Sequence, residues 1–314
     1  MLIAIDHGNK QMKTRNLVFT SGLTESDNPP PFGDSILEYK GKYYTTSEQR
    51  IPYLRDKTVD NRFYILTLYA IACEIEEADC YSEKEIMDVQ LVVGLPPAHY
   101  GTLAKKFEGY FMRGGQVEEF KFRGKPYSIY INEVMSFPQA HAAAVSVYGQ
   151  IKHYNKLMVV DIGGFTVDYL QINNGKPDRS VCDSLEYGVI RLYNDIKSKI
   201  NADFDLLLEE SDIDTILQDE PSEYDDKIKS IVASMSQSFI SNLLGNLRER
   251  MIDLRTGKTV FVGGGSILLK KQIVATDKVI NPVFVEQISA NVRGYELLYK
   301  SRKAKDEGYG RQEG

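Results

Sequence analysis

The feature that most constrains the fold of this chain is a weak internal duplication. A run of buried type, Leu2–Ile5, leads into the turn Asp6-His7-Gly8, and a second β-rich run follows at Asn16–Thr20. The same order recurs about half a chain later in the segment 157–172, which is centred on Asp161-Ile162-Gly163-Gly164. Apolar runs bounded by glycine turns are typical of buried strands. Two such copies predict two similar α/β domains that face each other across a cleft.

Each Asp-x-Gly turn has the composition expected of half a phosphate site. Glycine lets backbone N–H groups approach phosphate oxygens, and small polar residues add donors. An aspartate would repel phosphate, so its expected partner is magnesium, held through water. The candidates are Gly8, Asn9 and Lys13 in the first copy, and Gly163, Gly164, Thr166 and Asp168 in the second. A single Asp-x-Gly is more often a plain tight hairpin, and only the pair favours phosphate binding.

A glycine run forms the third element of the expected site. Gly263, Gly264 and Gly265 follow the predicted strand Thr259–Val262 and precede Ser266. Glycines between a strand and a helix start leave room for a base or ribose against the backbone, with the helix N-terminus directed at the ligand. A flexible loop explains the run equally well when it is taken alone, but its place after both turns favours an adenosine site.

In this order the motifs resemble those of the actin, heat-shock-chaperone and sugar-kinase superfamily. Asp6-x-Gly8…Lys13 is similar to the phosphate 1 motif, Pro138-Gln139-Ala140 to connect 1, Asp161–Asp168 to phosphate 2, Gly263–Ser266 to adenosine, and Asn291–Gly294 to connect 2. The compact length of 314 residues and the phrase Gly94-Leu95-Pro96 look most like the ParM/StbA proteins of plasmid segregation. The resemblance implies an α/β, two-domain actin-like fold. Each domain would be a ribonuclease-H-like mixed sheet flanked by helices, with the nucleotide cleft between them.

The resemblance also implies roles for single residues. Asp6 and Asp161 would hold hydrated magnesium, and Gln139, together with Asp161, would be catalytic. The phosphates of ATP or ADP would bind Gly8, Asn9, Lys13, Gly163, Gly164 and Thr166, and the adenosine would lie against Gly263, Gly264 and Gly265. ParM-type relatives often have glutamate where this chain has Gln139, and an amide orients water but is a poor base. The alternative for Gln139 is a helix N-terminal residue with no chemical role.

The pattern of segments predicts the domain limits. Domain I would comprise residues 1–155 together with a C-terminal helix, 284–300, that packs back on it, and domain II would comprise 156–283. Subdomains would be inserted at about 27–90 and 185–255, and 301–314 would be a flexible tail.

Two predicted helices carry small residues four apart. One is an alanine-rich helix over 139–149, with Ala140 and Ala144, and the other is the C-terminal helix, with Ala290 and Gly294. Such stripes allow two helices to cross closely. They fit a hinge between domains and tight static packing equally well.

Charge and apolar content exclude some classes of protein. The formal net charge of −6 argues against direct sequence-specific DNA binding, because duplex binding relies on basic surface. No apolar stretch approaches the ~20 residues needed to cross a bilayer, and the first residues do not form a signal peptide, so a cytoplasmic protein without membrane contact is expected. The segment 203–226 holds 11 acidic residues and no lysine or arginine. It fits a filament contact, a docking face for a basic adaptor or simply a solvated face.

The function implied by the resemblance is ATP hydrolysis coupled to filament dynamics. The protein would assemble head to tail and segregate plasmid or other mobile-element DNA through a DNA-bound adaptor. Two alternatives remain open at this point: a non-polymerising small-molecule kinase of the same superfamily, and a membrane-associated actin-like scaffold. The kinase would need a catalytic aspartate that the sequence does not identify, and the scaffold an amphipathic anchor that neither end of the sequence contains.

Overall fold

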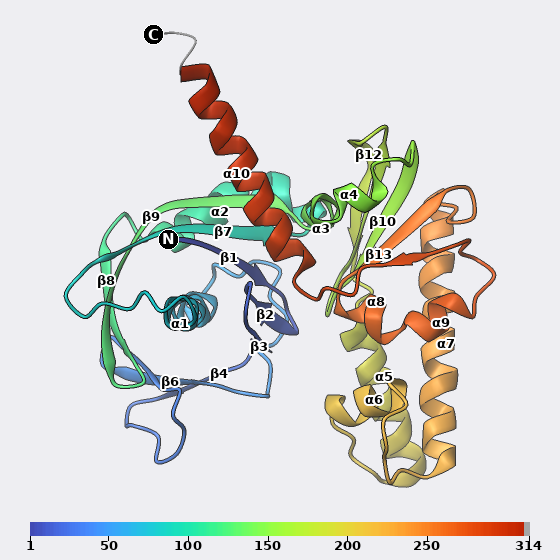
Figure 1. The fold of residues 1–314 in the computed structure, drawn as a ribbon. Helices are drawn as coiled ribbons and strands as arrows, with labels where there is room; N and C mark the ends of the chain where they lie inside the picture. The colour runs from blue at the N-terminus through green and yellow to red at the C-terminus, as the bar shows by residue number, and fades with distance from the viewer. Residues whose placement is uncertain (311–314) are drawn as a thin grey trace. The chain divides into compact units, whose positions relative to one another are not determined.

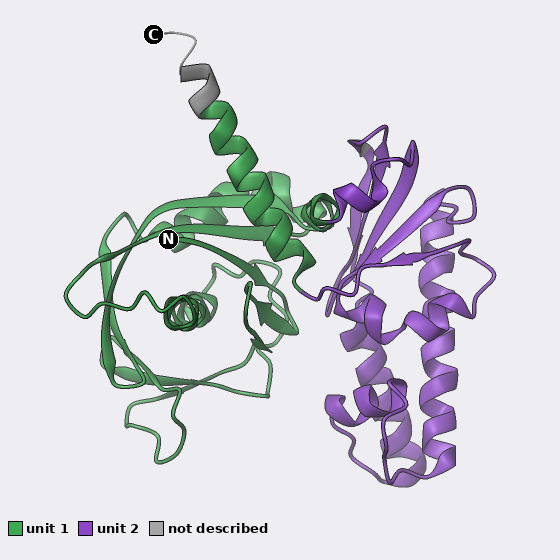
Figure 2. Cartoon of the chain, viewed as in Figure 1, with its two compact units in different colours: residues 1–146, 289–314 green, residues 147–288 purple. Residues whose placement is uncertain are grey.

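The computed structural model describes residues 1–310 and forms two compact units (Figure 2). Unit 1 comprises residues 1–146 and the C-terminal stretch from Ser289, and unit 2 comprises Val147–Ile288. The first change of unit precedes the short helix α4 (Tyr148–Ile151), which the sequence-based limits had assigned to domain I. Within the described residues, no helix is both long and apolar enough to cross a membrane.

Unit 1 is built on a nine-stranded mixed sheet in the order β3-β2-β1-β7-β9-β8-β5-β6-β4. Its strands are β1 (Leu2–His7), β2 (Gln11–Lys13), β3 (Val18–Thr20), β4 (Leu23–Ser26), β5 (Leu37–Tyr39), β6 (Lys42–Thr46), β7 (Met87–Leu95), β8 (Val117–Phe122) and β9 (Lys125–Pro138). Its helices are α1 (Arg62–Glu77), α2 (Pro97–Met112), α3 (His141–Ser146) and α10 (Ala290–Gly310).

Helices cover both faces of the central strands of unit 1. The strands β1, β7 and β9 run parallel, with Ile5 opposite Val93 and Leu95 opposite Pro138. Because side chains alternate along a strand, Ile3 and Ile5 enter the core formed with α1 and α2, whereas Ala4 packs with α3 and α10.

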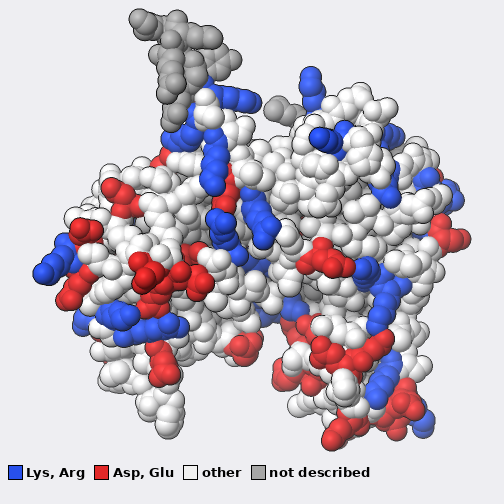
Figure 3. All heavy atoms as spheres, in the orientation of Figure 1, with Lys and Arg blue, Asp and Glu red and all other residues white. Residues whose placement is uncertain are grey.

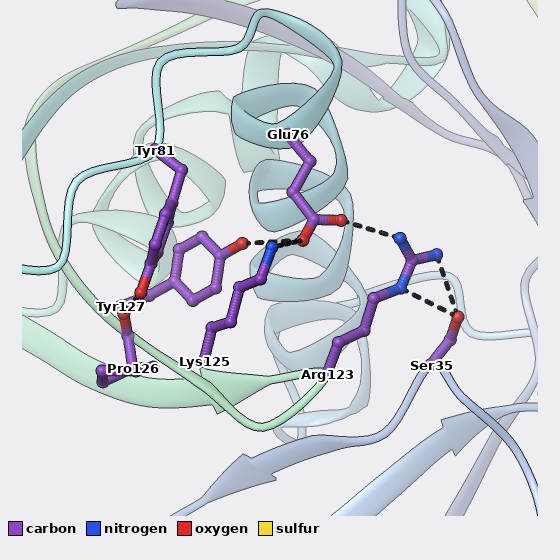
Figure 4. Close-up of polar contacts among 7 residues, drawn as sticks. All are labelled: Ser35, Glu76, Tyr81, Arg123, Lys125, Pro126 and Tyr127. Carbon is purple, nitrogen blue, oxygen red and sulfur yellow. Dashed lines mark hydrogen bonds and ion pairs between the residues drawn. The ribbon is translucent and has the colours of Figure 1, made fainter.

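The sheet of unit 1 curls around α1, which is seen end-on inside the ring of strands in Figure 1. This position explains why α1 is apolar on every side, with eleven of its sixteen residues buried. Its carboxyl end is tied to the β8–β9 turn, as Figure 4 shows. Glu76 accepts hydrogen bonds from Arg123 (Nη1 to Oε2, 2.8 Å) and from Tyr127 (OH to Oε1, 3.2 Å).

Unit 2 contains a five-stranded sheet in the order β12-β11-β10-β13-β14. Its strands are β10 (Lys156–Ile162), β11 (Val167–Asn173), β12 (Lys176–Leu185), β13 (Lys258–Val262) and β14 (Val283–Phe284). Besides α4, its helices are α5 (Val189–Phe204), α6 (Glu210–Leu217), α7 (Asp226–Glu249), α8 (Gly264–Leu268) and α9 (Lys270–Val274). The main core lies between one face of this sheet and the helices α5, α6, α7 and α9.

Three local predictions need correction. Asp6 lies on a hairpin whose second strand is β2 rather than Asn16–Thr20, and β3 adds a third strand. The alanine-rich helix begins at His141 rather than at Gln139, because Ala140 adopts a left-handed φ of 58°. It is also interrupted at Val147, which has φ −113° and ψ 13°, between α3 and α4.

The C-terminal helix is the third correction. It begins at Ala290, because Phe284 belongs to β14 and pairs with β13. It continues to Gly310, through most of the stretch expected as a flexible tail, while residues 311–314 lie outside the described residues. Glu133 on β9 holds this part of α10, since it accepts a hydrogen bond from the Tyr299 hydroxyl (2.6 Å) and pairs with Lys303 (2.8 Å).

Candidate nucleotide-binding residues

The first group of predicted site residues gathers at one edge of the unit 1 sheet. The strands β1, β7 and β9 are parallel neighbours, so their carboxyl ends meet at the same edge. Asp6 and Gly8 lie at the end of β1, and Gln139 follows the last residue of β9. The edge beyond the carboxyl ends of parallel strands is where open α/β sheets place their ligands.

Asp6 is the centre of this group. It is 3% exposed, and its Oδ1 accepts a hydrogen bond from Gln139 Nε2 at 2.7 Å. Lys13 faces Asp6 across the β1–β2 pair, with its Nζ 3.9 Å from Oδ2. The main-chain N–H of Gln139 donates to Leu95 O (2.9 Å), which fixes the residue at the end of β7. A buried carboxylate is therefore held by one amide and lies near one ammonium group, as burial of a charge requires.

The turn after Asp6 requires its glycine. A Cβ at Gly8 would lie 2.5 Å from Gln11 O, closer than real Cβ atoms approach. Ser21 braces the turn, because its hydroxyl donates to Gly8 O (2.6 Å) and its N–H donates to Lys10 O (3.0 Å). Asn9 lies between these contacts and is partly exposed. The two hydrogen bonds from Ser21 thus hold one side of the turn, and polar groups remain at its surface.

Two buried residues join this group without having been assigned a role from the sequence. Lys57 is 8% exposed, and its ammonium group donates a hydrogen bond to the carbonyl oxygen of His7. The His7 ring is fully buried among aromatic rings, and its Nε2 contacts the Thr67 hydroxyl (2.8 Å). Burial lowers the pKa of His7 well below its ordinary value, and the nearby Lys57 charge lowers it further, so the ring is neutral. Lys57 lies in an irregular segment with no motif, and only its burial reveals it.

The second group lies in unit 2, at the β10–β11 turn. Gly163 N–H donates to Thr166 O (2.9 Å), which closes the turn, and Thr166 is 8% exposed. Asp161 and Asp168 occupy directly opposite positions on the two antiparallel strands. Both are buried, at 6% and 3% exposure.

The same turn also supports the start of α5. Val189 N–H donates to Gly163 O (3.1 Å), and Ile190 N–H donates to Gly164 O (2.9 Å). The carbonyls of the turn therefore satisfy N–H groups that the first turn of a helix leaves without internal partners. Within this turn, the carbonyl oxygens of Gly163 and Gly164 are thus bonded to α5, and the Gly163 N–H to Thr166 O.

The glycine run packs directly against Asp161. Strand β13 lies parallel to β10, with Val262 opposite Asp161. Gly263 has φ 86° and ψ 157°, and a Cβ there would lie 2.2 Å from Asp161 Oδ1. Gly265 is also crowded, since its Cβ would lie 2.6 Å from Ile162 Cγ2, whereas a Cβ at Gly264 would meet nothing within 4 Å. Two of the three glycines are thus required by geometry, and the third lies open.

The predicted residues therefore form two groups, one in each unit. Asp6, Gly8, Asn9, Lys13 and Gln139 come together in unit 1, and Asp161, Gly163, Gly164, Thr166, Gly263, Gly264 and Gly265 in unit 2. Among the described residues, no group of three or more His, Cys, Asp or Glu side chains is arranged to hold a metal ion.

Two family models match the chain, one in each half. The model described as the N-terminal domain of actin-like proteins matches residues 4–141, and the model described as the C-terminal part of the archaeal, MreB-like actin homologue matches residues 159–275. A search of curated proteins found no match.

Solved structures of actin homologues cover almost the whole chain. A ParM from a 15-stranded filament of Clostridium botulinum has a TM-score of 0.75 at 16% identity, covering 96% of this chain and 99% of that one. The actin-like protein Alp7A has a TM-score of 0.74 at 15% identity, covering 100% of both chains. The archaeal actin homologue Ta0583 in complex with ADP has a TM-score of 0.68 at 18% identity, covering 94% and 97%. The predicted two-domain actin-like fold is confirmed by these matches.

Proposed function

Since this chain belongs to the actin-like proteins, we propose that it is an ATPase that assembles into filaments and segregates plasmid or other mobile-element DNA through a DNA-bound adaptor. The observation that carries the proposal is the environment of Asp6. A buried carboxylate at the carboxyl edge of a parallel sheet contacts an amide and lies near a lysine, beside a turn that excludes a Cβ. This is a preorganised polar site at the edge where open α/β sheets bind their ligands.

The two groups of residues suit a nucleotide triphosphate. In unit 1, the amides near Gly8, the Asn9 side chain and the Lys13 ammonium group would contact phosphate oxygens. In unit 2, Gly163, Gly164 and Thr166 would do the same, and Gly263, Gly264 and Gly265 would leave room for the adenosine. The structure of the archaeal relative with ADP supports a nucleotide as the ligand.

Gln139 would hold the attacking water. Its Nε2 donates to Asp6, which leaves the amide oxygen to accept a hydrogen bond from a water. Phosphoryl transfer depends mainly on positioning and on stabilisation of charge, so an oriented amide is adequate for slow hydrolysis.

The donor set also fits magnesium. This ion prefers oxygen ligands, keeps several waters and is usually bound by one or two carboxylates together with phosphates. Asp6 and Asp161 are buried carboxylates in the two groups and would hold its waters. Magnesium, when bound, would neutralise charge on the phosphates. Asp161 is kept in place by the close packing of Gly263 against its Oδ1.

Two observations support the proposed partners. The filament of the Clostridium botulinum relative supports head-to-tail self-assembly. The net charge of −6 supports an adaptor as the DNA-binding component. The adaptor itself rests on the resemblance to ParM proteins.

The test is ninety-degree light scattering after addition of magnesium-ATP, with phosphate release followed in parallel. Scattering that rises above a threshold protein concentration and decays as ATP is consumed is the expected result. Asp161→Ala should abolish phosphate release, whereas Asp183→Ala, at an exposed position on β12, should leave it unchanged. Phosphate release without scattering would contradict the filament, and unchanged release by Asp161→Ala would contradict the assigned site.

A further inference from the structure

A cavity of about 220 Å³ lies in unit 2, at the end of the sheet away from the β10–β11 turn. Lys156 and Lys258, the first residues of β10 and β13, are part of its lining, whereas Asp161 and Gly263 follow at the other ends of these strands. The lining is mixed, and its apolar members include Leu157 and Met158. The cavity is therefore separate from the residues proposed to bind nucleotide.

Three cationic side chains and one carboxylate line this cavity, and the carboxylate, that of Asp253, is paired with Arg255 (2.8 Å). Lys156, Arg250 and Lys258 all line it, and among the described residues none of the three forms an ion pair with a carboxylate. Some other cations of unit 2 pair with a carboxylate, as Lys199 does with Asp203 (2.8 Å) and Lys270 with Glu286 (2.9 Å). In a chain with a net charge of −6, three unpaired cations at one cavity favour an acidic partner.

Two further features of the cavity indicate a docking site. Thr259 is 1% exposed, and its hydroxyl has no hydrogen-bond partner within the described part of the chain. Met251 at the rim is 92% exposed and has a left-handed φ of 63°. Strained residues and exposed large apolar side chains concentrate at functional surfaces.

A matching surface lies in the acidic segment 203–226. Residues 205–209 form an irregular stretch between α5 and α6, in which Leu206 and Leu208 pack against the core of unit 2. Leu207 between them points outward and is 81% exposed. Asp205, Glu209 and Glu210 lie within three residues of it. The result is an apolar side chain that projects from an acidic surface.

The two surfaces lie at opposite ends of unit 2. Helix α7 begins at the last residue of the acidic segment and ends just before Arg250 at the cavity, and its 24 residues span roughly 36 Å. Figure 3 shows acidic side chains gathered at the end of this unit where α6 lies in Figure 1. Complementary surfaces at opposite ends of one molecule cannot pair within that molecule, but they can join successive copies.

We propose that Leu207 and its acidic neighbours on one copy of the chain dock into the cationic cavity at Lys156, Arg250 and Lys258 on the next copy. Leu207 would meet Met251 and the apolar members of the lining, while the flanking carboxylates would pair with the three cations. The contact is heterologous and propagates, so it would be one longitudinal contact of a filament. The inference rests on the proposed function and specifies its interface.

The test uses two variants that each block one surface. Leu207→Asp removes the projecting side chain, and Lys156→Glu with Arg250→Glu reverses the charge of the cavity; all three positions are exposed. Either variant should raise the critical concentration for assembly with magnesium-ATP at least about tenfold, the equivalent of about 1.4 kcal/mol. The matched controls are Val274→Asp and Lys176→Glu, at exposed positions of unit 2 outside both surfaces, and they should assemble like the wild type. Unchanged thermal melts and binding of a fluorescent ATP analogue would show that each variant is folded.

Mixing the two variants makes the test decisive. Each retains one intact surface, so an equimolar mixture should form a dimer, measurable by light scattering after size-exclusion chromatography, and no filament. Assembly of either variant at the wild-type critical concentration, or two blocked variants that fail to pair, would overturn the interface while leaving the proposed function standing. Absence of assembly by the wild-type protein would overturn both.

Discussion

Replacing Gly263 by alanine tests the packing on which the unit 2 group depends. Gly263 has φ 86° and ψ 157°, a region of backbone conformation that is essentially restricted to glycine and costs other residues roughly 1–3 kcal/mol. The new Cβ would also lie 2.2 Å from Asp161 Oδ1 and 2.7 Å from Ile162 O. One of these groups must move, and overpacking of this kind costs roughly 1–3 kcal/mol more.

The two costs together lower the free energy of unfolding by roughly 2–6 kcal/mol in Gly263→Ala. At about 2–4 °C per kcal/mol for a protein of this size, the Tm should fall by at least about 4 °C. The displaced Asp161 should also weaken the response to ligand. Saturating magnesium-ADP at 100 times its Kd would stabilise the wild type by about 2.7 kcal/mol, and the variant should gain less at the same concentration.

Gly264→Ala is the matched control, because a Cβ there meets nothing within 4 Å and the residue begins α8 in an ordinary helical conformation. Without nucleotide, its Tm should equal or slightly exceed that of the wild type. Differential scanning fluorimetry of the three proteins, with and without magnesium-ADP, gives both quantities. Equal melting temperatures for the two variants would refute the claim that Gly263 is required by its conformation and by its contact with Asp161.

Three further predictions concern unit 1. Gln139→Ala should slow phosphate release roughly a hundredfold and preserve assembly, because it removes a water-positioning group; loss of assembly in a scattering assay would mean the residue is structural. Gly294→Ala should lower the free energy of unfolding by roughly 1–3 kcal/mol or more, and with it the Tm, because its Cβ would overlap Ala142 O. Gly245→Ala, in open space on α7, should not lower the Tm. Burial opposes ionisation of Glu133, but hydrogen bonds from Lys303 and Tyr299 outweigh it and keep the pKa of this carboxyl below its ordinary value. Its hold on α10 should therefore be present above about pH 4.3 and be lost as the pH falls further. Protection of the amides of residues 300–306 against hydrogen exchange, measured relative to the intrinsic rate at each pH, would report this loss. Protection there that does not change with pH or in Glu133→Gln would contradict it.

The sequence predicts the strands and turns of the site well, because their signals are local. Buried runs before Asp6, Asp161 and Gly263 fix three strand ends, and parallel pairing then places each at the carboxyl edge of its sheet. Local sequence does not show which of the adjacent glycines the fold requires. Gly263 and Gly264 are equivalent in the sequence, and only the position of the Asp161 side chain distinguishes them.

Errors arise where a tertiary contact overrides local propensity. Ala140 favours helix by composition, yet its N–H donates to Asn291 Oδ1 (3.2 Å) and its φ is 58°, because the chain must turn between β9 and α3. Lys57 belongs to no sequence motif, so its role could not be predicted; only the fold brings its ammonium group to the His7 carbonyl oxygen. The polar sequence at the end of α10 predicts a flexible tail, but Lys303 forms an ion pair with Glu133 on β9.

The contacts around Gln139 connect the helix crossing of unit 1 with its buried carboxylate. Gly294 lets α10 approach Ala142 on α3, and Asn291 on α10 accepts from the N–H of Ala140. The next residue back is Gln139, whose side chain donates to Asp6. A shift of α10 by a fraction of an ångström would therefore move the group that is proposed to hold the attacking water. From the sequence alone, the small residues of these two helices fit a hinge or static packing. In the structure they lie at a helix crossing that is connected, through Asn291 and Ala140, to the residue proposed to hold the attacking water. Their substitution should change phosphate release as well as stability.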